Sequence, residues 1–302
     1  MTASVALPLR IGARTVAHVR RRLIPTTLGL EAARSGALPA LDPLPSACDG
    51  YWVVSLAAAS LQQLLAQHPE LTAFVRQRYR RSYVSFDGDF VSYLGSFSGK
   101  SRSTLKRKLR KLADRSGGVL DLRIYRSAAE MDEFYRHART VSALTYQERL
   151  LGCGLPEGDE FLEDLRSRAR RDAVRGWVLF LDGAPISYLY APADGDTLIY
   201  HSLGYDPEHA GFSPGAVLQF EAMRQLFEEG RFRLFDFTNG EGQHKTQFAT
   251  GSIDCLDLLL LRPTLSNHAA GHLLNAFDAA VAALKKSTAA LKLERLVRSV
   301  MR

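Results

Sequence analysis

Apolar and polar residues follow two different periods in the second half of the chain. VLDLRIY (residues 119–125) alternates and holds the β-branched and aromatic residues that strands favour. Ser127 to Glu130 then has the spacing of a helix capping box, and an amphipathic run continues to about Leu144. A second helical run covers about residues 157–171. This part of the chain is therefore predicted to form a strand followed by two helices.

Three apolar runs joined by short polar turns come next. WVLFL, ISYLYA and TLIYHSLGY are separated by Asp182-Gly183 and by PADGD, which is typical of an antiparallel meander. A helix begins near residue 213 and ends at Gly230, and its apolar stripe is made of Ala216, Phe220, Met223 and Phe227. The strand LFDF, a turn, a short helix near His244 and the strand IDCLDLLLLR complete the order. The prediction is an α/β (α+β) fold with a mixed, mostly antiparallel sheet flanked by helices.

The rest of the chain divides by composition. Residues 1–40 open with an arginine-rich stretch whose first acidic residue is Glu31, which predicts a basic, poorly ordered arm. Residues 41–98 hold a strand candidate (YWVVSL), a helix candidate at about 62–80 and a hairpin candidate, RSYVSF and FVSYLGSF around Asp87-Gly88, and so predict a smaller αβ module. Residues 119–265 form the main domain, and residues 266–302 have the pattern of a basic amphipathic helix.

A basic helix is predicted over residues 99–118, between the two modules. KSRSTLKRKLRK (100–111) carries seven basic residues and no acid, while Leu105, Leu109 and Leu112 recur at helical spacing. We expect the leucines to pack and the charges to stay exposed. Such a surface suits RNA, a lipid headgroup or a phosphorylated cofactor, although no aromatic residue is interleaved for base stacking.

Composition narrows the class of protein. The chain has 302 residues, 46% of them hydrophobic, and a net charge of +7, which favours acidic partners without choosing among them. Cys48, Cys153 and Cys255 lie far apart without metal-ligand spacing, so we expect no metal site and a reducing compartment. No apolar stretch is long enough to cross a bilayer. These features predict a cytoplasmic protein.

The stretch GFSPGA marks an unusually open helix start. Ser213 suits a helix cap, Pro214 suits the first turn, and Gly215 leaves the backbone bare. A helix N-terminus offers unpaired N–H groups and about half a positive charge to an anion. Two interpretations remain open, a plain cap and a phosphate seat.

The order of elements, GFSPGA and FDFTNGEGQHKTQF together resemble the GNAT acetyltransferase superfamily, in particular its CelD-like cellulose-biosynthesis branch, which is related to the Fem-type transferases. The resemblance covers most of residues 85–262 and implies a GNAT-like sheet. Two departures stand out. The chain does not match the superfamily's general phosphate-loop sequence pattern, because Ala210 and Ser213 occupy the first and fourth positions of that pattern. The branch usually has tyrosine where this chain has His244.

The resemblance implies an acyl-CoA co-substrate, with acetyl-CoA as the default, and a set of site residues. The pyrophosphate is expected on the α-helix start and the amide-bearing arm along the preceding strand, which assigns cofactor binding to Leu203, Gly204, Tyr205, Gly211, Phe212, Ser213, Pro214, Gly215, Ala216 and Lys245. Asp236 and His244 are the candidate catalytic residues, as bases for the acceptor amine. His201 and Tyr205 are weaker candidates.

Three functions follow from these assignments. The leading one is an acyl-CoA-dependent N-acyltransferase that acts directly on an amine, with an amino sugar as the acceptor suggested by the family resemblance. The second is a Fem-like transferase that takes an aminoacyl group from tRNA and holds the RNA on residues 100–112. The third is a non-catalytic binding module with the same fold.

Overall fold

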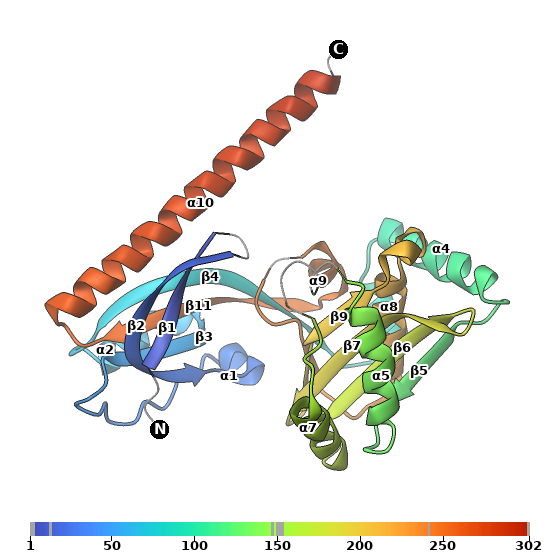
Figure 1. The fold of residues 1–302 in the computed structure, drawn as a ribbon, viewed down its shortest axis with the longest axis horizontal. Coiled ribbons are helices and arrows are strands. Elements are labelled where there is room, and N and C mark those ends of the chain that lie inside the picture. Colours follow the sequence, from blue (N-terminus) through green and yellow to red (C-terminus); the bar gives the residue numbers. More distant parts are fainter. Residues whose placement is uncertain (1–3, 12–13, 146–147, 149–153, 241, 301–302) are drawn as a thin grey trace. The chain divides into compact units, whose positions relative to one another are not determined.

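The computed structural model describes residues 4–11, 14–145, 148, 154–240 and 242–300 (Figure 1). The chain falls into two compact units, residues 1–80 with 253–302, and residues 81–252. Each unit combines strands with helices, and the strand pairs are mostly antiparallel, as the sequence predicts for the fold class. The chain passes from one unit to the other within β4 (Thr72–Ser85) and within β11 (Gly251–Leu261).

The unit of residues 81–252 contains the predicted order of elements. Its strands are β5 (Asp121–Tyr125), β6 (Val174–Leu181), β7 (Ala184–Asp194), β8 (Thr197–Ile199), β9 (Ser202–Tyr205) and β10 (Leu234–Asp236). Its helices are α3 (Phe90–Gly95), α4 (Gly99–Arg115), α5 (Met131–Ser142), α7 (Asp159–Arg170), the 3₁₀ helix η2 (Pro207–Phe212), α8 (Pro214–Glu229) and α9 (Gln243–Phe248). The strands run in the order β10-β8-β7-β6-β5, the end of β4 pairs with β10, and β9 pairs with β7.

Both faces of this sheet are covered, because neighbouring residues of a strand point to opposite sides. Trp177 and Leu179 of β6 pack into a cluster with α4 and α8, whereas Val178 and Phe180 pack into a second cluster with α5 and α7. The sheet is therefore the middle layer of this unit, and each face has its own core.

Two local predictions in this unit are confirmed. The carboxylate of Glu130 accepts the backbone N–H groups of Arg126 and Ser127 at 2.8 Å, as a capping box requires. In α4, Leu105 and Leu112 are buried against α8 while the basic side chains stay largely exposed.

The other unit contains the N-terminal and C-terminal parts of the chain. Its strands pair in the order β1 (Ser4–Ile11), β2 (Arg14–Thr27), β3 (Gly50–Ala57), β11 and β4. Its helices are α1 (Leu30–Ser35), the 3₁₀ helix η1 (Ala58–Ser60), α2 (Leu61–Gln67) and α10 (Leu265–Val300). Within the described residues, no helix is both long enough and apolar enough to pass through a membrane.

The structure differs from the sequence prediction at the N-terminus. The predicted arm over residues 1–40 instead holds the antiparallel pair β1/β2 and the helix α1. Leu7 and Leu23 are each only 1% exposed, in a cluster with Leu259, Leu261 and Leu274. These partners lie more than 230 residues away in sequence. The local sequence, with its excess of arginine, therefore does not indicate that strands form here.

Three further boundaries need correction. The helix predicted over residues 62–80 ends at Gln67, and β4 begins at Thr72. The second arm of the predicted hairpin is α3, where the Asp89 carboxylate accepts the Ser92 N–H at 2.7 Å. Residues 253–265 group with the N-terminal unit and not with residues 119–252, because β11 pairs with β3 from Cys255 to Leu261. Long-range strand pairing decides the position of β11, whereas a local cap decides that of α3.

Candidate active site

The start of α8 lies where the sequence places it, but Ser213 does not cap it with its side chain. Ser213 adopts a left-handed conformation, with φ 54° and ψ 50°, and its hydroxyl makes no capping hydrogen bond. Its carbonyl oxygen accepts the N–H groups of Ala216 at 3.0 Å and Val217 at 3.2 Å. A left-handed serine is a strained choice, which is common where a loop must present its backbone to a ligand. The first turn holds no acidic residue, so nothing within it compensates the positive end of the helix dipole.

A gap opens in the sheet next to this helix start. β8 runs parallel to β10, and just after this pairing the Tyr200 N–H donates to the Asp236 carbonyl at 2.8 Å. Beyond it, β9 pairs with β7 and has no other strand partner among the described residues. The Asp206 N–H donates to the Ile186 carbonyl at 2.9 Å. Antiparallel bonding alternates, so the N–H and C=O groups of Leu203 and Tyr205 face the open edge of β9.

A pocket of about 340 Å³ occupies the angle between β9 and α8. Its lining is mainly apolar and aromatic and consists of Tyr200, Leu203, Tyr205, Ala210, Ser213, Gly215, Ala216, Gln219 and Phe248. A Cβ atom on Gly215 would lie 2.9 Å from Cδ2 of Leu203 and 3.5 Å from Cδ1 of Tyr205. A larger residue at position 215 would require the Leu203 side chain to shift, a close approach that the sequence pattern does not reveal.

One buried polar side chain that lines the pocket is that of Gln219. It is 2% exposed, and neither its Nε2 nor its Oε1 atom has a hydrogen-bond partner among the described residues. The sequence pattern places this residue inside the helix and assigns it no role. A signal was present, since Gln219 lies one helical turn after Gly215 and Ala216.

Asp236 is placed differently from the prediction. Its side chain is 1% exposed at the end of β10, in the core of the unit and not at an open rim. The Arg81 guanidinium donates to both of its oxygens, with Nη2 at 2.5 Å from Oδ2 and Nε at 3.1 Å from Oδ1. The Thr238 N–H also donates to Oδ1 at 2.8 Å. With both oxygens already accepting, Asp236 is poorly arranged to take a proton from a substrate.

The remaining predicted residues after β10 are only partly accounted for. Lys245 donates from Nζ to the carbonyl oxygens of Phe237 at 2.7 Å and Asn239 at 2.8 Å, so it holds the turn together. Burial lowers the pKa of its ammonium group. His244 lies in α9, but its side chain is outside the part of the chain that the structure describes.

His201 lies where β8 gives way to β9, on the side of α5 and α7. Its ring is 5.0 Å from that of Tyr190, which packs against Phe161 of α7. Nδ1 is 2.7 Å from the Ser202 hydroxyl, which leaves Nε2 available. Although the side chain reaches solvent, desolvation by the surrounding atoms lowers the pKa of the imidazole below its ordinary value of 6.5.

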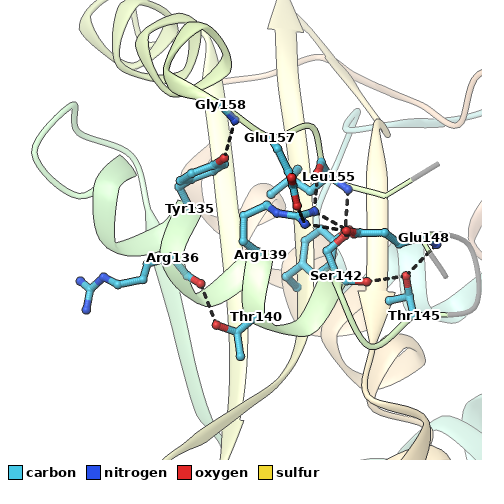
Figure 2. Close-up of polar contacts among 11 residues, drawn as sticks. Tyr135, Arg136, Arg139, Thr140, Ser142, Thr145, Glu148, Leu155, Glu157 and Gly158 are labelled. Atoms are coloured by element: carbon cyan, nitrogen blue, oxygen red, sulfur yellow. Dashed lines mark hydrogen bonds and ion pairs between the residues drawn. The ribbon is translucent and has the colours of Figure 1, made fainter. Parts of the chain in front are cut away.

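A polar network joins α5 to Glu148 and Leu155 on this same side of the sheet (Figure 2). Arg139 of α5 binds both oxygens of Glu148, at 2.7 Å and 2.5 Å, and also the Leu155 carbonyl. Ser142 accepts the Leu155 N–H at 2.8 Å and the Tyr188 hydroxyl at 3.2 Å. The Arg139 contact lowers the pKa of Glu148, so this carboxyl is held as an anion.

Gly204 connects this network to the gap in the sheet. A Cβ atom there would lie 2.4 Å from Cε1 of Tyr188 and 2.9 Å from Cγ2 of Thr145. Only glycine allows β9 to lie so close to these side chains. The two faces of β9 therefore have different neighbours. Leu203 and Tyr205 lie beside α8 and the pocket, whereas Gly204 lies on the α5 side.

The basic helix α4 lies alongside the start of α8. Lys111 donates from Nζ to the Gly211 carbonyl at 3.0 Å, and its ammonium lies 5.1 Å from the centre of the Phe212 ring. This contact places a cation at the turn that precedes α8. Gly211 and Phe212, predicted to bind the cofactor, thus form the outer part of the helix start and do not line the pocket itself.

Residues 99–246, just under half of the chain, match the family model described as the acetyltransferase (GNAT) domain. The matched segment contains α4, β9, the start of α8 and the pocket. It is therefore similar to GNAT-type acetyltransferase domains, as the sequence motifs indicate. No curated protein matches the chain.

Two solved structures show the same fold at low sequence identity. One is the C-terminal DUF2156 domain of a candidate lysylphosphatidylglycerol synthetase from Agrobacterium fabrum, 15% identical, with a TM-score of 0.50, covering 83% of this chain and 75% of that one. The other is FemX, 11% identical, with a TM-score of 0.51, covering 71% of this chain and 72% of that one. At these identities the likeness concerns the fold alone.

Proposed function

We propose that residues 81–252 form an acyl-CoA-dependent N-acyltransferase that transfers an acyl group, acetyl by default, directly to an amine. The observation that carries the proposal is the pocket in which the uncompensated N-terminus of α8 meets the open edge of β9. Similarity to the GNAT acetyltransferase domain over residues 99–246 supports it.

Each part of an acyl-CoA has a matching group in this site. The pyrophosphate suits the end of α8, where the dipole contributes about 0.3 to 2 kcal/mol, together with the cation of Lys111. The amide-bearing arm suits the backbone groups of Leu203 and Tyr205, which offer the bonding pattern of a missing strand. One of these N–H groups is suitably placed to donate to the thioester oxygen as negative charge develops on it.

The acceptor amine must be neutral when it attacks the thioester carbonyl. The new C–N bond forms and the C–S bond breaks. CoA leaves as a thiolate, which takes up a proton from water to become the thiol, and the nitrogen loses one proton to a base. We assign this proton to Nε2 of His201, since its lowered pKa keeps the imidazole neutral at pH 7 and its position faces the α5 side. His244 remains a second candidate, and Asp236 is better explained as the partner of Arg81.

Binding and transfer can be measured separately. In titration calorimetry, the 302-residue chain should bind acetyl-CoA, and a panel of primary amines that includes amino sugars should identify an acceptor by release of CoA thiol. The CelD-like resemblance is the reason to include amino sugars. Failure of this chain to bind any acyl-CoA would overturn the proposal.

A Fem-like aminoacyl transfer from tRNA is the second candidate. The exposed basic residues of α4, among them Lys106, Arg107 and Arg110, favour it. Their phosphate contacts would make binding weaken steeply with salt. Binding of an aminoacylated RNA hairpin with a steep salt dependence, without binding of acetyl-CoA, would support this candidate, and binding of neither ligand would support a non-catalytic module.

A further inference from the structure

Gln219 carries a polar group that the protein itself leaves unsatisfied. The side chain is 2% exposed, and its Nε2 and Oε1 atoms both lack hydrogen-bond partners in the described part of the chain. Buried amides without partners are rare, because their loss of contact with water is not compensated. Since Gln219 also lines the pocket, the missing partner is expected on a ligand.

The other polar side chains of α8 do not share this property. Gln225 on the same helix accepts the indole N–H of Trp177 at 2.9 Å. Arg224 forms ion pairs with Glu221 and Glu228. A leucine in place of Gln219 would fill a similar volume without any unmade hydrogen bond, so the glutamine at this position disfavours the empty state.

The position of Gln219 on α8 sets the spacing of the groups that it complements. Gly215, Ala216 and Gln219 lie on one side of the helix and all line the pocket. At a rise of 1.5 Å per residue, Gln219 lies about 6 Å further along the helix than Gly215. A ligand anchored by an anion at the helix start and extending along α8 would therefore pass Gln219 beyond its anchored end.

We infer that the Gln219 amide pairs with an amide of the acyl donor's arm and so selects donors that carry the acyl group on a pantetheine chain. This inference rests on the proposed function. A primary amide both donates and accepts, which complements the C=O and N–H of a secondary amide. The adenine of an RNA end would also match a glutamine. The open edge of β9 beside Gln219 favours a linear chain of amides over a ring.

The test compares two ligands and two substitutions by titration calorimetry. Gln219→Leu should weaken acetyl-CoA binding about 10- to 100-fold, since an arm amide loses its partner. It should leave unchanged the affinity for adenosine 3′,5′-bisphosphate, which has the nucleotide but no arm. Its melting temperature should equal or exceed that of the wild type. Gln225→Leu is the matched control, and it should melt earlier while keeping its affinity for acetyl-CoA.

The outcomes separate this inference from the proposed function. Wild-type affinity of Gln219→Leu for acetyl-CoA overturns the inference and leaves the acyltransferase proposal standing. An equal loss for both ligands also overturns it, because Gln219 would then act on the nucleotide or on the shape of the pocket. If the wild type binds no acyl-CoA but binds an aminoacylated RNA hairpin less tightly after Gln219→Leu, the ligand is an adenosine, and both proposals fail.

Discussion

At the residue scale, the ion pair between Asp236 and Arg81 allows a structural role of Asp236 to be distinguished from a catalytic one. Both side chains are less than 10% exposed, and they form a buried ion pair. Asp236→Asn removes the negative charge of this pair, and breaking a buried pair in this way costs about 3 kcal/mol. We therefore expect the unfolding midpoint in urea to fall markedly.

Asp164→Asn is the control for that experiment, because Asp164 pairs with Arg168 on the solvent side of α7 and both side chains are about a third exposed or more. Its urea midpoint should hardly move. Equal midpoints for Asp236→Asn and the wild type would mean that the carboxylate is free, and would return it to the list of bases.

His201 predicts a specific pH dependence. If the neutral imidazole takes the proton, kcat/KM should fall on the acid side with a midpoint below 6.5, since burial lowers this pKa. Stability should follow the same direction, because a depressed histidine pKa means that folding is weakened as the pH falls from 6.5 through the lowered value.

His201→Gln should reduce turnover about a hundredfold and abolish the fall of kcat/KM at acid pH, which is the acid limb of the pH profile. His209→Gln, which alters a histidine bonded to Asp206 at 3.0 Å in η2, should keep the limb. An unchanged limb in His201→Gln would assign the proton to another group, with His244 the next to be tested.

At the scale of single elements, the end of α8 allows a charge test that spares the fold. Ala216 lines the pocket in the first turn, where an acidic side chain stabilises an empty helix by about 0.3 to 1 kcal/mol. Ala216→Glu should therefore keep or raise the melting temperature and abolish acetyl-CoA binding. Ala216→Gln has nearly the same shape without the charge and should retain measurable affinity. Similar affinities of both variants for acetyl-CoA would mean that the helix start is a plain cap and does not bind the pyrophosphate.

The basic helix α4 divides into two regions with different expected roles. Lys111 reaches the turn before α8, whereas Lys106 lines a separate groove with Arg102 and Arg110. Lys111→Gln should weaken acetyl-CoA binding about threefold to tenfold at low salt and less at high salt. Lys106→Gln should leave it unchanged. A loss for Lys106→Gln alone, measured with an RNA hairpin, would favour the Fem-like candidate.

Sequence periodicity predicts elements well where local signals agree. The capping box at Ser127, the leucine stripe of α4 and the Gly230 stop of α8 are each confirmed. Local signals fail where a distant partner decides the conformation. Arg81 lies 155 residues from Asp236, and the side chain that would come closest to a Cβ atom at position 215 is on β9. The helix start was thus enough to locate the candidate site in the sequence. The roles of Gln219, Arg81 and Lys111 could be recognised only from the folded structure.

At the scale of the whole molecule, the division into two units could not be predicted from composition. Residues 253–302 join residues 1–80 through the pairing of β11 with β3, which spans about 200 positions of sequence. Leu7 and Leu23 are buried in a cluster with residues from the far end of the chain, and the arginine-rich sequence of β2 gives no indication of these partners. Hydrophobic patterning identifies strands but does not specify their partners.

The same division predicts where a bound ligand should protect the protein. All the residues that line the pocket belong to residues 81–252. Ligand binding stabilises the states that bind it, and saturating acetyl-CoA at 100 times its Kd adds about 2.7 kcal/mol. Amide hydrogen exchange should therefore slow in β9 and α8, while the exchange of β1 and β2 stays the same. Uniform protection of both units would mean that they unfold as one, and protection confined to β1 and β2 would move the binding site out of residues 81–252.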